Sequence, residues 1–214
     1  MAKKTTHLRE INKKTLPGKT VERLSLYRRA LISRVKKEYI YSHEIADLLH
    51  FTPVQVRRDL MLMKYSGSSG KGYQVKDLIH SIGKVIDPPE TRYAAVVGMG
   101  NLGRAIARHL ANKREFIKVL ASFDIDKEKI SKCSSGVRCY HLDEFEAVVR
   151  QFEISIGIIT TPPEAAVEIK NLMVKSGIKG ILNFTSTLLD VPENVYLEEY
   201  DIVTSLEKIA YFTK

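Results

Sequence analysis

The chain has 214 residues, 44% of them hydrophobic, and a net charge of +9 at pH 7. This length suits two domains, and no apolar run approaches the roughly 20 residues that a membrane-spanning helix needs. Cys133 and Cys139 make neither a disulfide framework nor a metal site, and the Lys-rich N-terminus lacks the apolar core of a signal peptide. We therefore expect a cytoplasmic protein that binds no metal and does not enter a membrane.

The positive charge is concentrated in the first 87 residues. They contain 18 Lys and Arg against 8 Asp and Glu, whereas residues 88–214 contain 16 basic and 17 acidic residues. This asymmetry indicates that one part of the chain meets a polyanion and the other does not. A basic surface that is merely solvated would also account for it.

The N-terminal elements begin with a predicted flexible arm over 1–19, which holds five Lys residues and Pro17-Gly18 but little apolar periodicity. An amphipathic helix is expected over 21–37, and Ser42 can cap a second helix over 43–49. Thr52-Pro53 then signals the start of a third helix, over about 53–64, in which Gln55 can complete a capping box with Thr52.

The third helix is amphipathic, with Val56, Leu60 and Met63 on one side and a polar set of Gln55, Arg57, Arg58 and Lys64. Two short helices joined by a tight turn, the second rich in Arg and Gln, predict a helix-turn-helix. The Gly- and Ser-rich segment 66–73 predicts a wing. We therefore expect a winged helix-turn-helix DNA-binding domain over 20–87, with a plain helical bundle as the alternative.

A further amphipathic helix is predicted from about Val75 to Val85, and Pro88-Pro89 ends it, so 88–91 is expected to be a linker. Beyond the linker, strands are expected near 94–98, 117–124, 154–161 and 180–185, with helices near 101–111, 142–151 and 163–176. This alternation predicts an α/β domain with a doubly wound parallel sheet, a Rossmann domain over 92–199. Residues 200–214 hold an apolar helix over about 203–213. It packs on its own sheet or inserts into a partner subunit.

A glycine motif follows the first of these strands: Gly98-Met99-Gly100-Asn101-Leu102-Gly103. The first glycine permits a tight turn, the second lets a pyrophosphate approach the backbone, and the third, with Ala105, lets the helix pack on the strand. The next strand ends at Asp124, where a carboxylate accepts hydrogen bonds from an adenosine ribose and repels a 2′-phosphate. The motif predicts a site for NADH and NAD+. A structural glycine turn with no ligand is the alternative.

Two other functional classes compete with DNA binding. An NAD-dependent oxidoreductase with a basic accessory domain would need a proton donor or acceptor near the nicotinamide. His109 is the only histidine near the cofactor segment, and a lone histidine there is more often a helix-surface residue, so no catalytic residue is assigned. A CoA- or nucleotide-binding interaction module would leave the basic N-terminal region unexplained.

The arrangement resembles the Rex family of redox-sensing transcriptional repressors over nearly the whole chain from about residue 20. The matching segments are RLSLYRRAL (23–31), TPVQVRRDL (52–60), GKGYQV (70–75), GMGNLGRA (98–105), FDID (123–126), TPPEAA (161–166), GIKGILNF (177–184) and YDI (200–202). The resemblance implies a winged helix joined to a Rossmann domain. It also implies a homodimer with exchanged C-terminal helices that binds a palindromic operator in double-stranded DNA and leaves it when NADH binds.

The resemblance also implies roles for individual residues. The nicotinamide end of the cofactor would meet Thr160, Pro162, Asn183 and Phe184, and the DNA contacts would come from Thr52, Gln55, Arg57, Arg58, Lys71 and Tyr73. Arg29 and Asp201 match positions that pair across the domain boundary as a switch. The chain departs from the family at three places: His109 replaces a common tyrosine, Ser68-Ser69 replace a basic pair in the wing, and Thr185-Ser186 replace Ala-Pro.

Overall fold

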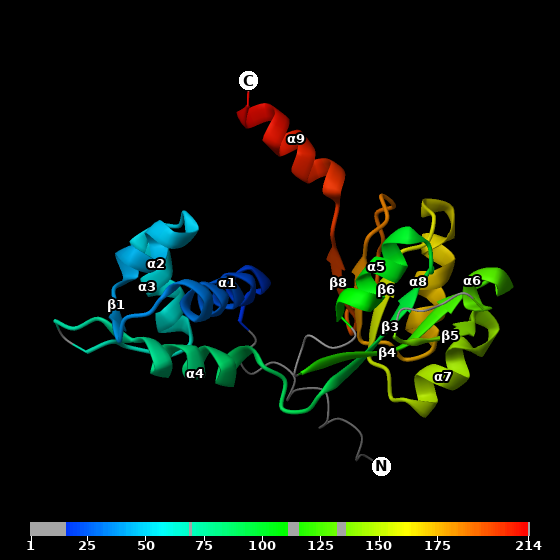
Figure 1. Ribbon diagram of the computed structural model, residues 1–214, viewed down its shortest axis with the longest axis horizontal. Helices are drawn as coiled ribbons and strands as arrows, with labels where there is room; N and C mark the ends of the chain where they lie inside the picture. The colour runs from blue at the N-terminus through cyan, green and yellow to red at the C-terminus, as the bar shows by residue number, and fades with distance from the viewer. Residues whose placement is uncertain (1–15, 69, 111–115, 132–135, 214) are drawn as a thin grey trace, which may run out of the picture. The chain divides into compact units, whose positions relative to one another are not determined.

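The computed structural model describes residues 16–213 except 69, 111–115 and 132–135. The chain divides into two compact units, residues 1–87 and 88–214 (Figure 1). Residues 1–15 of the arm predicted over 1–19 lie outside the described residues, as does Cys133. The end predicted for the arm is wrong, because Gly18 and Lys19 already belong to the first helix.

The N-terminal unit consists of helices α1 (Gly18–Arg34), α2 (Ser42–Leu49), α3 (Pro53–Leu62) and α4 (Val75–Ile86), with strands β1 (Tyr39–Ile40) and β2 (Tyr73–Gln74). The two strands pair antiparallel. Their connection includes a bridge between Ser68 and Gly72, which makes the predicted wing. The hydroxyl of Tyr41 donates to the carbonyl of Gly70 at 2.9 Å and so holds the wing against the start of α2.

The core of this unit is formed by one face of each helix. Its fully buried members include Leu24, Leu31, Ile45, Val56, Leu60, Leu78 and Ile82. The predicted inward residues of α3 are thus confirmed at Val56 and Leu60, while Met63 is partly buried. Val85, at the predicted end of the amphipathic helix that begins at Val75, is 42% exposed.

Local capping differs from the predictions at two places. Ser42 is the first residue of α2 rather than its N-cap, and the main-chain N–H of the preceding Tyr41 donates to Glu44 at 2.8 Å. Thr52 caps α3 as predicted, accepting from the N–H of Gln55 at 3.2 Å. The capping box is wrong, because the side chain of Gln55 donates to Asp59 instead, at 3.0 Å.

The C-terminal unit alternates strands and helices around a six-stranded sheet. Its strands are β3 (Arg92–Val97), β4 (Ile117–Asp124), β5 (Arg138–His141), β6 (Ile156–Ile159), β7 (Gly180–Asn183) and β8 (Tyr196–Glu199). Its helices are α5 (Asn101–Leu110), α6 (Lys127–Ser131), α7 (Phe145–Gln151), α8 (Ala166–Lys175) and α9 (Ile202–Phe212), with short 3-10 turns at Leu142–Glu144 and Pro163–Ala165.

All strand pairs in this sheet are parallel, in the order β5-β4-β3-β6-β7-β8. Numbered within the unit this is 3-2-1-4-5-6, the doubly wound Rossmann order, whose ligand crevice lies where the order reverses, between β3 and β6. Alternate residues of β3 enter different core clusters, Ala95 and Val97 one and Ala94 and Val96 the other. The sheet is therefore covered on both faces.

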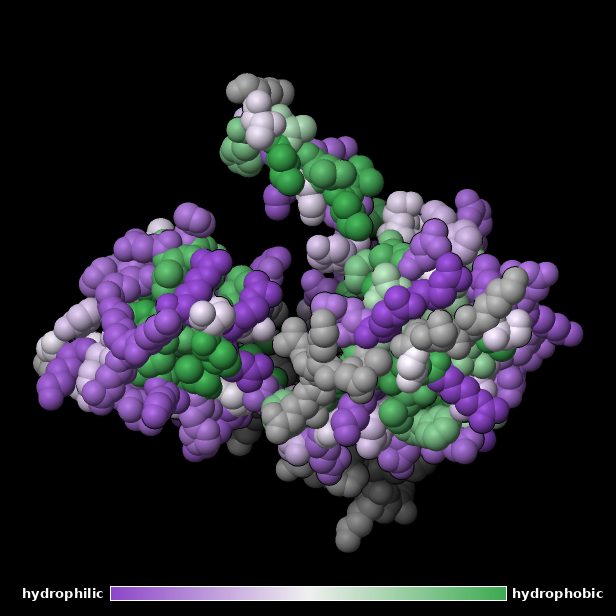
Figure 2. Space-filling view, in the orientation of Figure 1, coloured by the Kyte–Doolittle hydropathy of each residue, from purple (hydrophilic) through white to green (hydrophobic). Residues whose placement is uncertain are grey.

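The last helix, α9, contributes nothing to this core, since none of its residues is buried. Its large hydrophobic side chains are more than half exposed, namely Ile202, Val203, Leu206, Ile209, Tyr211 and Phe212. Figure 2 shows a green surface along much of the helix. Packing on its own sheet, one of the two alternatives for this helix, is therefore wrong. None of the described helices combines the length and apolarity of a membrane span.

Candidate dinucleotide site and nucleic-acid interface

The glycine loop joins β3 to α5 at the switch point of the sheet. Gly98 has φ +99°, a left-handed conformation, and a Cβ there would lie 2.8 Å from the main chain of Thr160. A Cβ on Gly103 would lie 1.9 Å from the carbonyl oxygen of Gly98, whereas one on Gly100 would meet no atom within 4 Å. The first and third glycines are thus required by the protein itself, and the second leaves open space for a ligand.

The helix after this loop packs differently from the prediction. Ala105 is exposed, whereas Ala107 is fully buried against the sheet. Close packing of α5 is therefore provided by Gly103 and Ala107, and the role predicted for Ala105 is wrong. The N-terminus of α5 follows Gly100 directly, and free N–H groups at a helix start favour an anion such as a pyrophosphate.

Asp124 ends β4 next to this loop and is 6% exposed. Its carboxylate accepts from the main-chain N–H of Met99 at 2.7 Å and from that of Asp126 at 2.9 Å, and the ammonium of Lys129 lies 3.7 Å away. A carboxylate has about four acceptor positions, so two remain for ribose hydroxyls. Asp124 therefore both holds the glycine loop and lines the site.

Thr160 follows β6 and faces the same loop. Its hydroxyl lies 2.8 Å from the carbonyl oxygen of Gly98 and 3.0 Å from that of Val97, so it donates to the turn of the loop. The neighbouring Thr161 hydroxyl is buried and has no partner among the described residues. A buried polar group without a partner is costly, which is consistent with a ligand at this position.

These groups surround a pocket of about 530 Å³. Of the predicted cofactor residues, Gly98, Gly100, Asp124, Thr160 and Pro162 line it. Lys129, Thr161 and Glu168 line it as well and were not predicted, since nothing in their local sequence marks them except their closeness to Asp124 or Pro162.

The other predicted cofactor residues do not line this pocket. Asn183 is buried and organises the loop after β7: its amide donates to Thr187 O at 2.8 Å and its oxygen accepts from Thr185. Phe184 packs against Tyr200, with ring centroids 5.3 Å apart. In the glycine loop, the side chain of Met99 is buried, Asn101 accepts from Arg104, and Leu102 is 42% exposed.

Helix α3 presents two arginines on the surface of the N-terminal unit. Arg57 and Arg58 are both exposed, and Arg57 donates to the hydroxyl of Ser42 at 3.0 Å. Val54 and Met61, 66% and 73% exposed, lie on the same face as Arg58. Exposed cations with apolar neighbours on the second helix of a helix-turn-helix suit contacts to phosphates and base edges.

On the inner side of α3, Asp59 is fully buried, which the sequence did not predict. Arg23 donates to it from Nε at 2.7 Å and from Nη2 at 2.8 Å, and the hydroxyl of Tyr27 donates at 2.8 Å. Burial opposes ionisation, but these hydrogen bonds outweigh it and hold the pKa of Asp59 below its usual value. Burial and the bond to Asp59 raise the pKa of Tyr27. The network fixes α3 against α1.

The remaining predicted DNA contacts lie nearby in the same unit. Lys71 is exposed in the wing, and Thr52 is exposed at the start of α3. Tyr73 is half-buried, with its ring 6.0 Å from that of Tyr65. Its position indicates that it supports the wing from inside.

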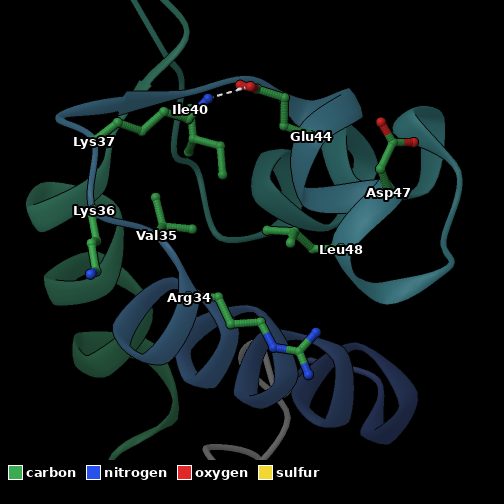
Figure 3. Close-up of a pocket in the computed structure, with 8 residues that line it drawn as sticks. All are labelled: Arg34, Val35, Lys36, Lys37, Ile40, Glu44, Asp47 and Leu48. Atoms are coloured by element: carbon green, nitrogen blue, oxygen red, sulfur yellow. Dashed lines mark hydrogen bonds and ion pairs between the residues drawn. The ribbon is translucent and has the colours of Figure 1, made fainter.

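A second pocket, of about 600 Å³, lies in the N-terminal unit between the end of α1 and α2 (Figure 3). Val35, Ile40 and Leu48 are its apolar residues, and its charges are of both signs, with Lys37 and Glu44 paired across it. It contains none of the predicted site residues.

The predicted switch residues lie in different units. Arg29 is exposed on α1, and Asp201 is the N-cap of α9, accepting from Val203 N at 2.9 Å and from the Thr204 hydroxyl at 2.7 Å. These hydrogen bonds lower the pKa of Asp201. His109 is exposed in the last turn of α5. Their pairing remains a prediction.

Known families match both units. The family model described as a CoA binding domain matches residues 90–187, and that described as a putative DNA-binding protein N-terminus matches residues 15–60. The redox-sensing transcriptional repressor Rex of Maridesulfovibrio salexigens is 37% identical, over 92% of this chain and 95% of its own. The Rex of Geobacillus sp. is 35% identical, over 92% of each chain.

Solved structures match over the whole fold. The Rex-family repressor RSP in complex with β-NAD+ and operator DNA superposes with a TM-score of 0.85 and 28% identity, covering 94% of each chain. RSP in complex with β-NADH gives a TM-score of 0.82, over 94% of this chain and 95% of that one. A winged helix followed by a Rossmann unit with an intact glycine loop defines a class of nucleotide-responsive transcription regulators. Within that class, this chain belongs to the Rex family of redox-sensing transcriptional repressors.

Proposed function

We propose that this protein is a repressor that binds a palindromic operator in double-stranded DNA and leaves it when NADH binds. The observation that carries the proposal is the pocket at the switch point. There, Gly100 leaves space beside the start of α5, and the buried carboxylate of Asp124 retains acceptor positions. The exposed cations of α3 in the other unit supply the surface for DNA.

The cofactor would be recognised from its two charged or polar parts. The loop Gly98–Gly103 and the start of α5 would hold the pyrophosphate, and Asp124 would accept from the adenosine ribose, which favours NADH over NADPH. Thr160 and Pro162 would lie toward the nicotinamide. Asn183 and Phe184 are assigned to the same end of the cofactor from the family resemblance alone. Arg57, Arg58, Gln55 and Lys71 would contact DNA.

We propose that the functional unit is a homodimer in which α9 is exchanged between subunits. This is supported by the exposure of Leu206, Ile209 and Phe212, at 58%, 59% and 80%, on a helix that buries nothing in its own unit. An apolar helix face of this kind is stabilised by a partner. Light scattering should show a dimer for the full chain, and Leu206→Glu should shift it toward the monomer.

We propose that NADH is a signal here and is not consumed. Membership in a family of repressors supports this, and we place the protein in the cytoplasm, where DNA and NADH meet. The deciding experiment measures binding of a palindromic duplex by fluorescence anisotropy with NADH, with NAD+ and without either, while absorbance follows the NADH concentration. Release by NADH at constant absorbance supports a sensor. Loss of NADH absorbance would indicate the oxidoreductase alternative.

A further inference from the structure

A buried carboxylate holds the side chain of Gln55 in place. One oxygen of Asp59 accepts from Gln55 Nε2 at 3.0 Å and from Arg23 Nη2 at 2.8 Å. The other accepts from Arg23 Nε at 2.7 Å and from the hydroxyl of Tyr27 at 2.8 Å. A carboxylate has about four acceptor positions, so every one of them is filled.

This arrangement decides which way the amide of Gln55 faces. An ionised carboxylate only accepts hydrogen bonds, so the amide nitrogen, and not the oxygen, must point to Asp59. Turning the amide over would place Gln55 Oε1 against an oxygen of Asp59 and leave a buried acceptor position empty. The side chain, which in a free glutamine offers either end, is therefore fixed in one orientation.

The fixed amide lies where a base would be read. Gln55 is the third residue of α3, and the first residues of the second helix in a helix-turn-helix contact base edges. The side chain is half-buried, beside the exposed Arg58. Within the described part of the chain, Gln55 Nε2 donates to Asp59 and Oε1 takes part in no hydrogen bond, so Oε1 keeps its capacity to accept one from a partner.

We propose that Gln55 reads an exocyclic amine in the major groove, N6 of adenine or N4 of cytosine, and that Asp59 is the positioning residue that sets this preference. The inference rests on the proposed DNA binding. Adenine and cytosine present an amine donor in the major groove, whereas guanine O6 and thymine O4 are acceptors. A fixed acceptor therefore selects the first pair of bases and is repelled by the second.

The first experiment compares sequence preferences. The full-length protein, without NADH, is incubated with a pool of duplexes randomised over about 20 base pairs, enough for two half-sites one helical turn apart. One position in each half-site should favour an amine-bearing base over guanine or thymine by about 5–150-fold. Gln55→Met is a variant of similar length without the amide. It should lose the base preference at that position and keep the wild-type base preferences at all other positions of the site.

The second experiment removes the amine from the DNA. In the enriched duplex, adenine at that position is replaced by purine, which lacks N6, or cytosine by 2-pyrimidinone, which lacks N4. The substitution should weaken wild-type binding by the same factor as Gln55→Met, and the two changes together should cost no more than either alone. Replacement by 7-deazaadenine, which keeps N6, should have no such effect.

The third experiment tests Asp59 through specificity. In Asp59→Asn the new amide can offer an oxygen or a nitrogen, so the amide of Gln55 can turn over. The ratio of the affinity for amine-bearing bases to that for guanine or thymine should then fall toward one. A merely structural role would weaken binding to all sequences equally and leave that ratio unchanged. If Asp59→Asn does not fold, the Gln55→Met variant and the duplexes that lack the amine still test whether Gln55 reads the amine.

The outcomes separate this inference from the proposed function. If the wild-type protein enriches no sequence, DNA binding itself fails. If it enriches a sequence but binds the amine-free duplex equally well, or if Gln55→Met gives an identical profile, only the role of Gln55 is overturned. If Gln55 reads the amine but Asp59→Asn keeps the full preference, the positioning role of Asp59 is overturned.

Discussion

The main-chain N–H of Met99 donates a 2.7 Å hydrogen bond to the carboxylate of Asp124, which ties the glycine loop after β3 to the end of β4. The residue that would distinguish NADH from NADPH therefore also holds in place the loop that would bind the pyrophosphate. Substitutions at Asp124 consequently act on two parts of the site, and the choice of variant decides which part is tested.

Asp124→Asn should narrow the preference for NADH over NADPH. The amide keeps one oxygen for Met99 but removes the negative charge and one acceptor. A hydrogen bond to a charged group contributes about 1.5–3 kcal/mol, so NADH affinity should fall by roughly 10- to 150-fold. Titration calorimetry with both cofactors measures the ratio of the NADH affinity to the NADPH affinity. Asp126→Asn, which changes a nearby charge outside the pocket, is the matched control, and an unchanged ratio in Asp124→Asn would refute the ribose role.

Gly100→Val should abolish NADH binding and preserve stability, whereas Gly103→Ala should lower stability. A Cβ at Gly100 would meet no protein atom within 4 Å, so the fold should persist while NADH binding is lost to steric exclusion. A Cβ at Gly103 would lie 1.9 Å from Gly98 O, so Gly103→Ala should lower the free energy of unfolding by about 1–3 kcal/mol. Urea denaturation and NADH titration of both variants check this. Equal stability losses would contradict it.

Arg58→Ala should weaken operator binding. An arginine that reads guanine contributes about 1–3 kcal/mol of discrimination, whereas one on a phosphate weakens all sequences alike and reduces the salt dependence. Anisotropy titrations at several salt concentrations distinguish the two cases. Lys175→Ala, which removes an exposed cation from α8, should bind as the wild type does. Wild-type affinity in Arg58→Ala would mean that this face of α3 does not meet DNA.

Acid should loosen the N-terminal unit through Asp59. Its pKa in the folded protein is lowered, so its stabilising contribution is present above the unfolded value near 3.8 and is lost as the pH falls through the lower folded value. Asp59→Asn should lower stability near neutral pH by about 1.5–3 kcal/mol and show a smaller further loss in acid. Amide hydrogen exchange of α1 and α3 in the full chain, corrected for the pH dependence of the intrinsic exchange rate, measures the stability near neutral pH and its loss in acid. A parallel acid loss in the variant would exclude Asp59 as the titrating group.

The residue at position 109 should affect NADH-induced release if Arg29 and Asp201 pair as a switch. NADH can shift the protein only toward a state that it binds more tightly. A histidine is shorter than the tyrosine that is common at this position in the family, so His109→Tyr should change the NADH concentration at which the operator is released. Operator affinity titrated with NADH for both proteins measures this. Identical titration curves would eliminate the histidine from the switch.

Local signals in the sequence were sufficient for much of the architecture. The bounds predicted for β4, 117–124, are confirmed, because a long apolar run between polar segments marks a buried central strand. Thr52 and Pro53 identified the start of α3 for a similarly local reason, since a cap and its partner lie within one turn. Strands β5 and β8 were missed because they are short edge strands with few buried residues.

The sequence by itself determined the periodic elements, the glycine loop and the concentration of charge in the first 87 residues, because each depends on residues close together in the chain. Only the tertiary structure decided that Asp59 is buried and that Ser42 supports Arg57. It also decided that Asn183 organises its own loop and that α9 buries nothing in its unit. In the sequence, Asp59 is an ordinary polar residue of a helix. The fold places Arg23 and Tyr27, 36 and 32 positions earlier, within hydrogen-bonding distance of it. The free energy of a buried charge depends on such distant partners, and local sequence patterns carry no record of them.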